Sequence, residues 1–89
     1  MAIVLDEWLN ILINGKPTSF TIHIRDELDQ YRKDTLFACK IIDEGEKKLV
    51  SGKENRYESR LAAGNDVWIV VWFDMDECIL LKHIGKEKR

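Results

Sequence analysis

Residues 67–73 read Val-Trp-Ile-Val-Val-Trp-Phe, a run of apolar residues rich in β-branched and aromatic types. Such a run is typical of a strand covered on both faces, because a strand with one wet face alternates apolar and polar side chains. Trp68, Val70 and Trp72 would point to one side of the strand, and the residues flanking them to the other. The run therefore predicts a central strand that needs cover on both sides.

The segment after this run has the same character. A polar connection at 74–77 leads into Cys-Ile-Leu-Leu at 78–81, which predicts a hairpin over residues 67–84 that is apolar on both faces. A chain of 89 residues has little material with which to cover two faces of one sheet. We therefore expect one face to lie under helices and the other to meet a second chain. The expected interface residues are Trp68, Val70, Trp72 and Leu80.

Residues 8–24 predict a first hairpin. Asn14-Gly15 supplies the positive φ angles of a type I′ turn, and the residues from Ser19 to Ile24 alternate apolar and polar. Pro17 cannot donate to a strand ladder, which leaves a longer loop as one alternative. A helical stripe that includes Trp8 is the other alternative, and the turn signal favours the strand.

The middle of the chain is harder to interpret. Residues 26–33 are acidic at the front and basic at the back, which favours a short helix. Residues 36–50 are interpreted as a second hairpin. The alternative is a single helix from Asp34 to Val50, which Gly45 would destabilise by about 1 kcal/mol relative to Ala.

A further helix is predicted after residue 50. Ser51 and Glu54 have the spacing of a capping box, in which each side chain satisfies an unpaired backbone N–H. Tyr57 and Leu61, four residues apart, would form its inward edge. Gly64 stands where a residue with positive φ would end it.

Together these elements predict an α+β fold. We expect a small antiparallel sheet of four to six strands, with two short helices packed on one face. Residues 1–85 would form one domain, and residues 86–89 a charged tail outside it.

The composition limits the functional classes. The chain is 45% hydrophobic and 34% charged, as in folded globular domains. A net charge of −2 and a pI near 5.6 argue against a general nucleic-acid binder. No window approaches the ~18 apolar residues that a membrane span needs. The N-terminus lacks the basic start of a signal peptide, so we expect a cytoplasmic protein. Cys39 and Cys78 are expected to be reduced and buried, with a disulfide as the alternative.

The sequence lacks the usual motifs of catalysis. It has no nucleophile elbow, phosphate-binding loop, Cys-x-x-Cys or His-x-x-x-His, so we expect no enzyme activity, no cofactor and no metal site. The acidic connection at 74–77 lacks the length and the glycine of a calcium-binding loop. A minor hypothesis makes His23, paired with Glu27 or Arg25, the acid–base residue of a small hydrolase or nuclease.

Basic residues between positions 32 and 60 suggest a second minor hypothesis, contact with RNA or another nucleic acid. Acidic residues are interleaved with them, a pattern typical of a solvated face with weak ion pairs. The residues that would carry such contact are Lys47, Lys48, Lys53, Arg56 and Arg60.

The favoured hypothesis is a non-enzymatic protein–protein interaction module. The small size, the acidic pI and the absence of a catalytic motif fit an accessory regulator, an immunity protein or an inhibitor. We expect it to be a homodimer or to bind an unidentified protein through an apolar, tryptophan-rich sheet face.

Overall fold

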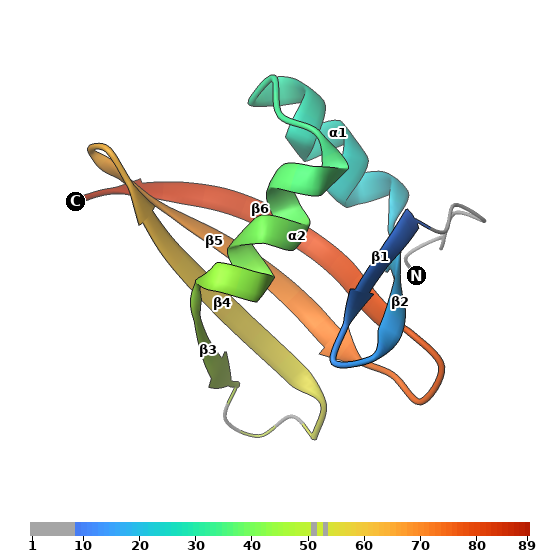
Figure 1. Cartoon of the computed structure of the whole chain (residues 1–89). Helices are drawn as coiled ribbons and strands as arrows, with labels where there is room; N and C mark the ends of the chain where they lie inside the picture. Colours follow the sequence, from blue (N-terminus) through green and yellow to red (C-terminus); the bar gives the residue numbers. More distant parts are fainter. Residues whose placement is uncertain (1–8, 51, 53) are drawn as a thin grey trace.

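Six strands and two helices follow one another in the computed structural model, which describes residues 9–50, 52 and 54–89, with side chains from Leu12 onward (Figure 1). In chain order they are β1 (Leu9–Ile13), β2 (Lys16–Phe20), α1 (Ile22–Gln30), α2 (Thr35–Glu44), β3 (Glu46–Leu49), β4 (Arg56–Ala63), β5 (Asp66–Asp74) and β6 (Ile79–Lys88). This confirms the predicted α+β class. Trp8, Ser51 and Lys53 lie outside the described residues.

All six strands form one curled sheet in the order β1-β2-β6-β5-β4-β3. The β2–β6 pair is parallel and the other pairs are antiparallel, so the sheet is mixed where the sequence predicted an antiparallel one. In the interior, β5 has neighbours on both sides: Val70 lies opposite Ile84 of β6 and Ser59 of β4. The predicted hairpin over 67–84 is confirmed as β5–β6.

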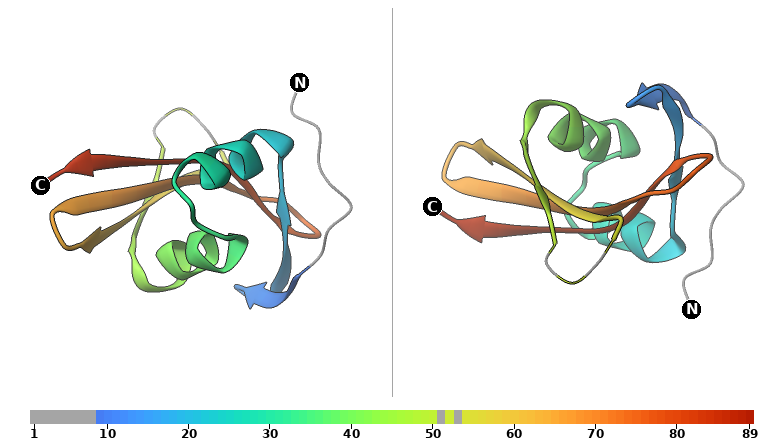
Figure 2. Two further views of the ribbon diagram at one scale, coloured as in Figure 1. Left: turned by 90° about the horizontal axis from the view of Figure 1, so that it is seen from above. Right: turned by 90° about the horizontal axis from the view of Figure 1, so that it is seen from below.

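The helices lie to one side of this sheet. α2 contacts β1, β4 and β5, while α1 runs beside β6 (Figures 1 and 2). α1 directs Ile24 and Leu28 into the same core. Neither helix, nor any other in the described part of the chain, is long and apolar enough to cross a membrane.

The first hairpin forms at the predicted turn. Asn14 and Gly15 have φ angles of 54° and 77°, as a type I′ turn requires. Lys16 and Pro17 belong to β2 itself, so no longer loop is present. A register shift in β1 between Leu9 and Leu12 accommodates the pairing.

The second strand ends earlier than the alternation predicted. β2 stops at Phe20, and α1 begins at Ile22 instead of near Asp26. Thr21 is the reason: its hydroxyl accepts the Ile24 N–H at 3.1 Å and donates to the Lys82 carbonyl at 3.1 Å. This N-cap redirects the chain from strand to helix, a local signal that the alternation concealed.

Replacing Thr21 by Val is expected to reduce the free energy of unfolding by about 2 kcal/mol. Valine keeps the shape of this fully buried side chain but loses both hydrogen bonds. Urea denaturation should show a lower midpoint with an unchanged m value. The control is Thr21→Ser, which keeps the hydroxyl, and a Val variant as stable as the Ser variant would contradict the capping role.

Residues 35–50 form neither the predicted hairpin nor a single helix. α2 begins at the N-cap Asp34, whose carboxylate accepts the Phe37 N–H at 2.9 Å, and ends at Gly45, where β3 follows. Its buried residues follow the pattern i, i+1, i+3, i+4, which places them on one face of a helix that packs on a sheet. They are Ala38, Cys39, Ile41 and Ile42.

The second predicted helix is wrong, because residues 56–63 are strand β4. Residues four positions apart, such as Tyr57 and Leu61, lie on the same face of a helix. They also lie on the same face of a strand, because the side chains of a strand alternate with a period of two. Ser59 lies between them and is buried on the same side, which distinguishes the two cases. Gly64, with φ of 62°, belongs to the β4–β5 turn.

The last strand includes the residues predicted as a tail. β6 runs to Lys88, which lies opposite Asp66, and the Arg89 N–H donates to the Asn65 carbonyl at 2.9 Å. Cys39 and Cys78 are both free, so the alternative of a disulfide is wrong; Cys39 is buried and Cys78 is half-buried.

Candidate functional site

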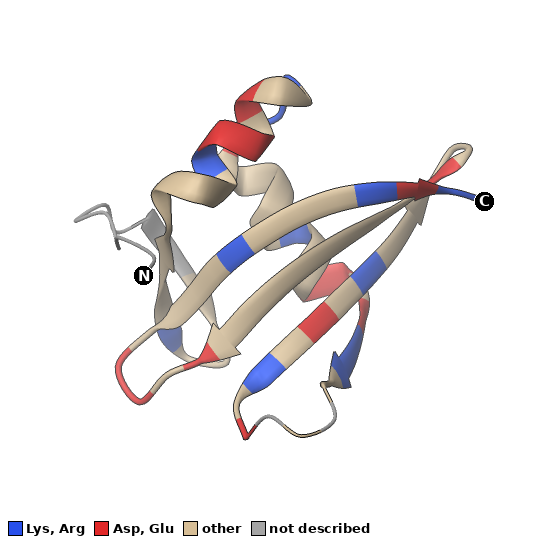
Figure 3. Ribbon diagram, turned by 180° about the vertical axis from the view of Figure 1, so that it is seen from behind, with Lys and Arg blue, Asp and Glu red and all other residues tan. Residues whose placement is uncertain are grey.

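The side of the sheet that faces away from α2 is turned toward the viewer in Figure 3, and the apolar residues of β5 that are only half-buried alternate with its buried ones. We call this side the outer face; its apolar stripe consists of Val67, Ile69, Val71 and Phe73 of β5 and Leu80 of β6. Burial alternates along β5, and these residues are half-buried where their neighbours are fully buried. The strand is thus apolar on both sides, as predicted, but only one side lies under a helix.

Charged side chains form a rim along the outer face. On β4, Arg56, Glu58 and Arg60 lie opposite Phe73, Val71 and Ile69, so positive and negative charges alternate (Figure 3). A residue on one strand and its partner on the next project from the same face of a sheet. The rim therefore borders the apolar stripe directly.

Two of the rim cations partly cover the stripe. The Arg60 guanidinium donates to Glu58 at 2.9 and 3.1 Å and reaches the Glu87 carboxylate of β6 at 3.5 Å, across β5. The Lys82 ammonium lies 5.4 Å from the centre of the Phe73 ring. Long charged side chains often shelter apolar surface with their stems. The monomer therefore supplies part of the cover that the sequence predicted from a second chain.

The predicted interface residues do not share one face. Trp68, Val70 and Trp72 are 6%, 0% and 1% exposed and belong to the core, so they cannot form the surface of a folded monomer. Trp68 makes edge-to-face contacts with Tyr31 and Phe37, which helices bring over it. Leu80, the fourth predicted residue, lies on the outer face, opposite Phe73.

The residues of the nucleic-acid hypothesis do not form one basic track. Lys47 and Lys48 are neighbours on β3 and project to opposite sides of the sheet. Arg56 and Arg60 lie on a strand instead of a helix, with Glu58 between them. Lys53 lies outside the described residues. The described members of the set are thus divided between two faces and interrupted by acid.

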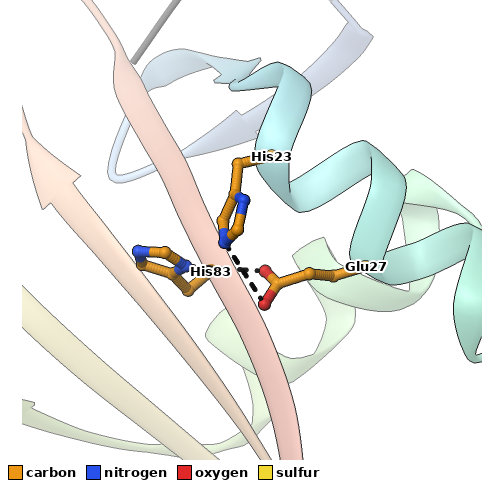
Figure 4. Close-up of side chains that lie close together, drawn as sticks. All are labelled: His23, Glu27 and His83. Carbon is orange, nitrogen blue, oxygen red and sulfur yellow. Dashed lines mark ion pairs between the residues drawn. The ribbon is translucent and has the colours of Figure 1, made fainter. Parts of the chain in front are cut away.

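A second candidate site lies where α1 meets β6 (Figure 4). His23 Nε2 is 3.5 Å from one oxygen of Glu27, and His83 Nδ1 is 3.6 Å from the other. The two imidazole rings are edge-to-face, with centroids 4.5 Å apart. We call these residues the His23–Glu27–His83 cluster. It contains the His23–Glu27 pair of the minor hydrolase hypothesis and adds a residue that the sequence did not suggest.

The edge of the sheet explains why these residues meet. β2 pairs with β6 only from Ile79 to Leu81, so the rest of that edge of β6 needs other partners. α1 supplies them: Glu27 Oε1 accepts the Ile84 N–H at 3.0 Å, just beyond the bond from Thr21 to the Lys82 carbonyl. The helix takes the place of a neighbouring strand, which satisfies an otherwise exposed strand edge.

Burial lowers the pKa of His83 below its usual value. The charges of His23 and Lys82 act in the same direction, and Glu27 opposes them. A lowered pKa favours the neutral imidazole, in which one ring nitrogen carries a lone pair. Such a nitrogen can accept a proton or bind a metal ion.

A cavity of about 250 Å³ lies between β1 and α2. Leu12 and Leu36 form its exposed apolar rim, and Cys39 lies in its wall. Burial raises the pKa of the Cys39 thiol to about 11, so it is protonated near pH 7 and a poor nucleophile. The cavity thus combines apolar side chains with the charged Lys40, Asp43 and Glu44, and its thiol is unreactive.

Comparisons of the chain with protein-family models, with curated proteins and with solved structures found no significant match. A fold does not by itself assign a function. The outer face and the His23–Glu27–His83 cluster are the features of the described residues that bear on function.

Proposed function

We propose that this protein is a non-enzymatic protein–protein interaction module that self-associates through the outer face. The observation that carries the proposal is the half-buried apolar stripe on β5, which no helix covers and which Leu80 continues on β6. A role as a cytoplasmic accessory regulator, immunity protein or inhibitor is the narrower form of the same proposal. The apolar surface it would use is aliphatic with one phenylalanine, not tryptophan-rich.

A second copy of the chain suits this surface because the rim carries both signs of charge. In a two-fold interface each patch meets itself, so a rim of one sign would repel its mate. The outer-face charges of β4 follow one another as Arg56, Glu58 and Arg60. If β4 of the second copy runs antiparallel to β4 of the first and is displaced by two residues, each Glu58 faces an arginine of the other copy. The apolar stripes would meet at the centre, with the charged pairs around them.

The available area predicts a weak dimer. The four strands β3 to β6 lie about 4.8 Å apart and β4 is 8 residues long, which gives a face of roughly 19 by 26 Å. Two such faces would bury about 1,000 Å², the lower end of specific interfaces. We therefore expect a dissociation constant in the micromolar range, not a permanent dimer.

Replacing Ile69 by Lys is expected to weaken self-association at least about 10-fold, because it places a charge at the centre of the stripe. Sedimentation velocity over a range of concentrations up to about 1 mM would measure it. The matched control is Leu36→Lys, an equal change at a leucine on α2 that is 58% exposed and lies away from the outer face. Circular dichroism establishes that both variants fold.

Two results would contradict this proposal. One is a wild-type protein that remains monomeric at about 1 mM, and the other is an Ile69→Lys variant that associates like wild type. If Ile69→Lys fails to fold, Val71→Thr replaces it, because it keeps the branched shape and adds one hydroxyl to the outer face. Unchanged association in that variant counts against the proposal in the same way.

A further inference from the structure

The His23–Glu27–His83 cluster presents three donor atoms from two elements far apart in the chain. One ligand atom from each residue lies within 4.8 Å of the other two. From this geometry we propose that the protein binds one zinc ion through His23, Glu27 and His83. Its three ligands come from one chain, but His83 lies opposite Val71 of the outer face, so zinc binding and self-association are measured separately.

The spacing of the donor atoms fits tetrahedral zinc. Ligand atoms about 2.0–2.1 Å from zinc at a tetrahedral angle are about 3.4 Å apart. Nε2 of His23 and Nδ1 of His83 lie 3.5 and 3.6 Å from the two oxygens of Glu27. All three donor atoms lie within 4.8 Å of one another, so side-chain rotations that bring the two nitrogens closer would place both of them and one oxygen around an ion.

The backbone holds the cluster in place. His23 and Glu27 are one turn apart on α1, which presents them on the same side of the helix. The Ile84 N–H donates to Glu27 Oε1 at 3.0 Å. The other carboxylate oxygen, Oε2, faces His23. A hydrogen bond of this kind to a ligating carboxylate fixes its orientation and raises metal affinity.

The donor set selects the kind of metal. Two imidazole nitrogens with one carboxylate suit zinc and other first-row divalent ions such as iron(II), whereas magnesium and calcium prefer oxygen ligands throughout. The side chains of His23 and His83 are 58% and 38% exposed, so the fourth position faces water. Only one of the three ligands is negatively charged, and the positive Lys82 near His83 repels a cation. Both features predict a moderate affinity for zinc. We expect a dissociation constant in the micromolar range, weaker than that of a four-ligand structural zinc site.

Isothermal titration of the full chain with zinc chloride tests the proposal. We expect one zinc per chain and a rise in Tm of several degrees when free zinc exceeds the dissociation constant 10-fold. His23→Ala and His83→Ala should each weaken binding by about 10- to 100-fold. Performing the titrations in the Ile69→Lys background separates the result from self-association.

Two control variants make the assignment specific. Asp29→Asn removes an exposed carboxylate of α1 that is not part of the cluster and should bind zinc like wild type. Cys78→Ser removes a half-buried thiol, a side chain that could itself bind zinc, and should also leave zinc binding unchanged. Absence of binding tighter than about 100 µM, binding that survives both histidine substitutions, or binding lost in Cys78→Ser would each overturn the site.

Discussion

Replacing Trp72 by Ala is expected to reduce the free energy of unfolding by about 3–5 kcal/mol. The side chain is 1% exposed and stacks on Tyr57, with ring centroids 4.6 Å apart. Its Nε1–H donates to the buried Ser59 hydroxyl at 2.8 Å, so truncation also leaves that hydroxyl unpaired. A domain of 89 residues has about 4–13 kcal/mol of stability in total. The variant should therefore be largely unfolded or close to it.

Chemical denaturation followed by circular dichroism measures this loss. The matched control is Phe73→Ala, the next residue on β5, whose half-buried ring lies on the outer face. We expect it to cost about 1–2 kcal/mol, because less apolar area leaves water on folding. Equal losses in the two variants would contradict the assignment of the tryptophan side of β5 to the core.

Replacing Gly45 by Ala is expected to cost about 3 kcal/mol, at the upper end of overpacking effects. The backbone at Gly45 has φ of −80°, which any residue tolerates, so the constraint is one of space. A Cβ atom there would collide with the carbonyl oxygen of Ile41 and lie 2.6 Å from that of Arg60. Both obstacles are backbone atoms, so α2 and β4 would have to separate.

Thermal unfolding should show the effect as a fall in Tm of roughly 10–20 °C. Gly85→Ala is the control, since an added Cβ at Gly85 meets nothing within 4 Å. That change should be neutral or slightly stabilising, because it reduces the freedom of the unfolded chain. A Gly45→Ala variant with the same Tm as Gly85→Ala would show that α2 and β4 do not approach this closely.

The parts of the fold that the sequence predicted correctly are those with a local cause. Asn14-Gly15 determines the first hairpin by itself, and the apolar run at 67–73 requires a strand inside the sheet. The helix predicted at 51–64 was wrong because four-residue spacing fits both a helix and a strand. The start of α1 was missed because the alternation of residues 19–24 concealed the N-cap Thr21, which also donates to the distant Lys82 carbonyl.

The candidate sites were predictable only in part, because both depend on long-range register. The sequence indicated that one side of β5 would be free, but both sides are apolar, so it did not show which. Tyr31 and Phe37 settle that choice by covering Trp68. His23 and Glu27 are visible as a pair four residues apart. His83 joins them only through the pairing of β2 with β6, which no local spacing reveals.

The most direct test is an isotope-filtered NOE experiment on an equal mixture of ¹³C,¹⁵N-labelled and unlabelled protein at about 1 mM. Self-association through the outer face predicts contacts between chains from the methyl groups of Val67, Ile69, Val71 and Leu80. It predicts none from Val70, which is fully buried under α2, or from Leu36, which is exposed on the far side. Intermolecular contacts confined to other methyl groups, or none at all, would contradict self-association through the outer face.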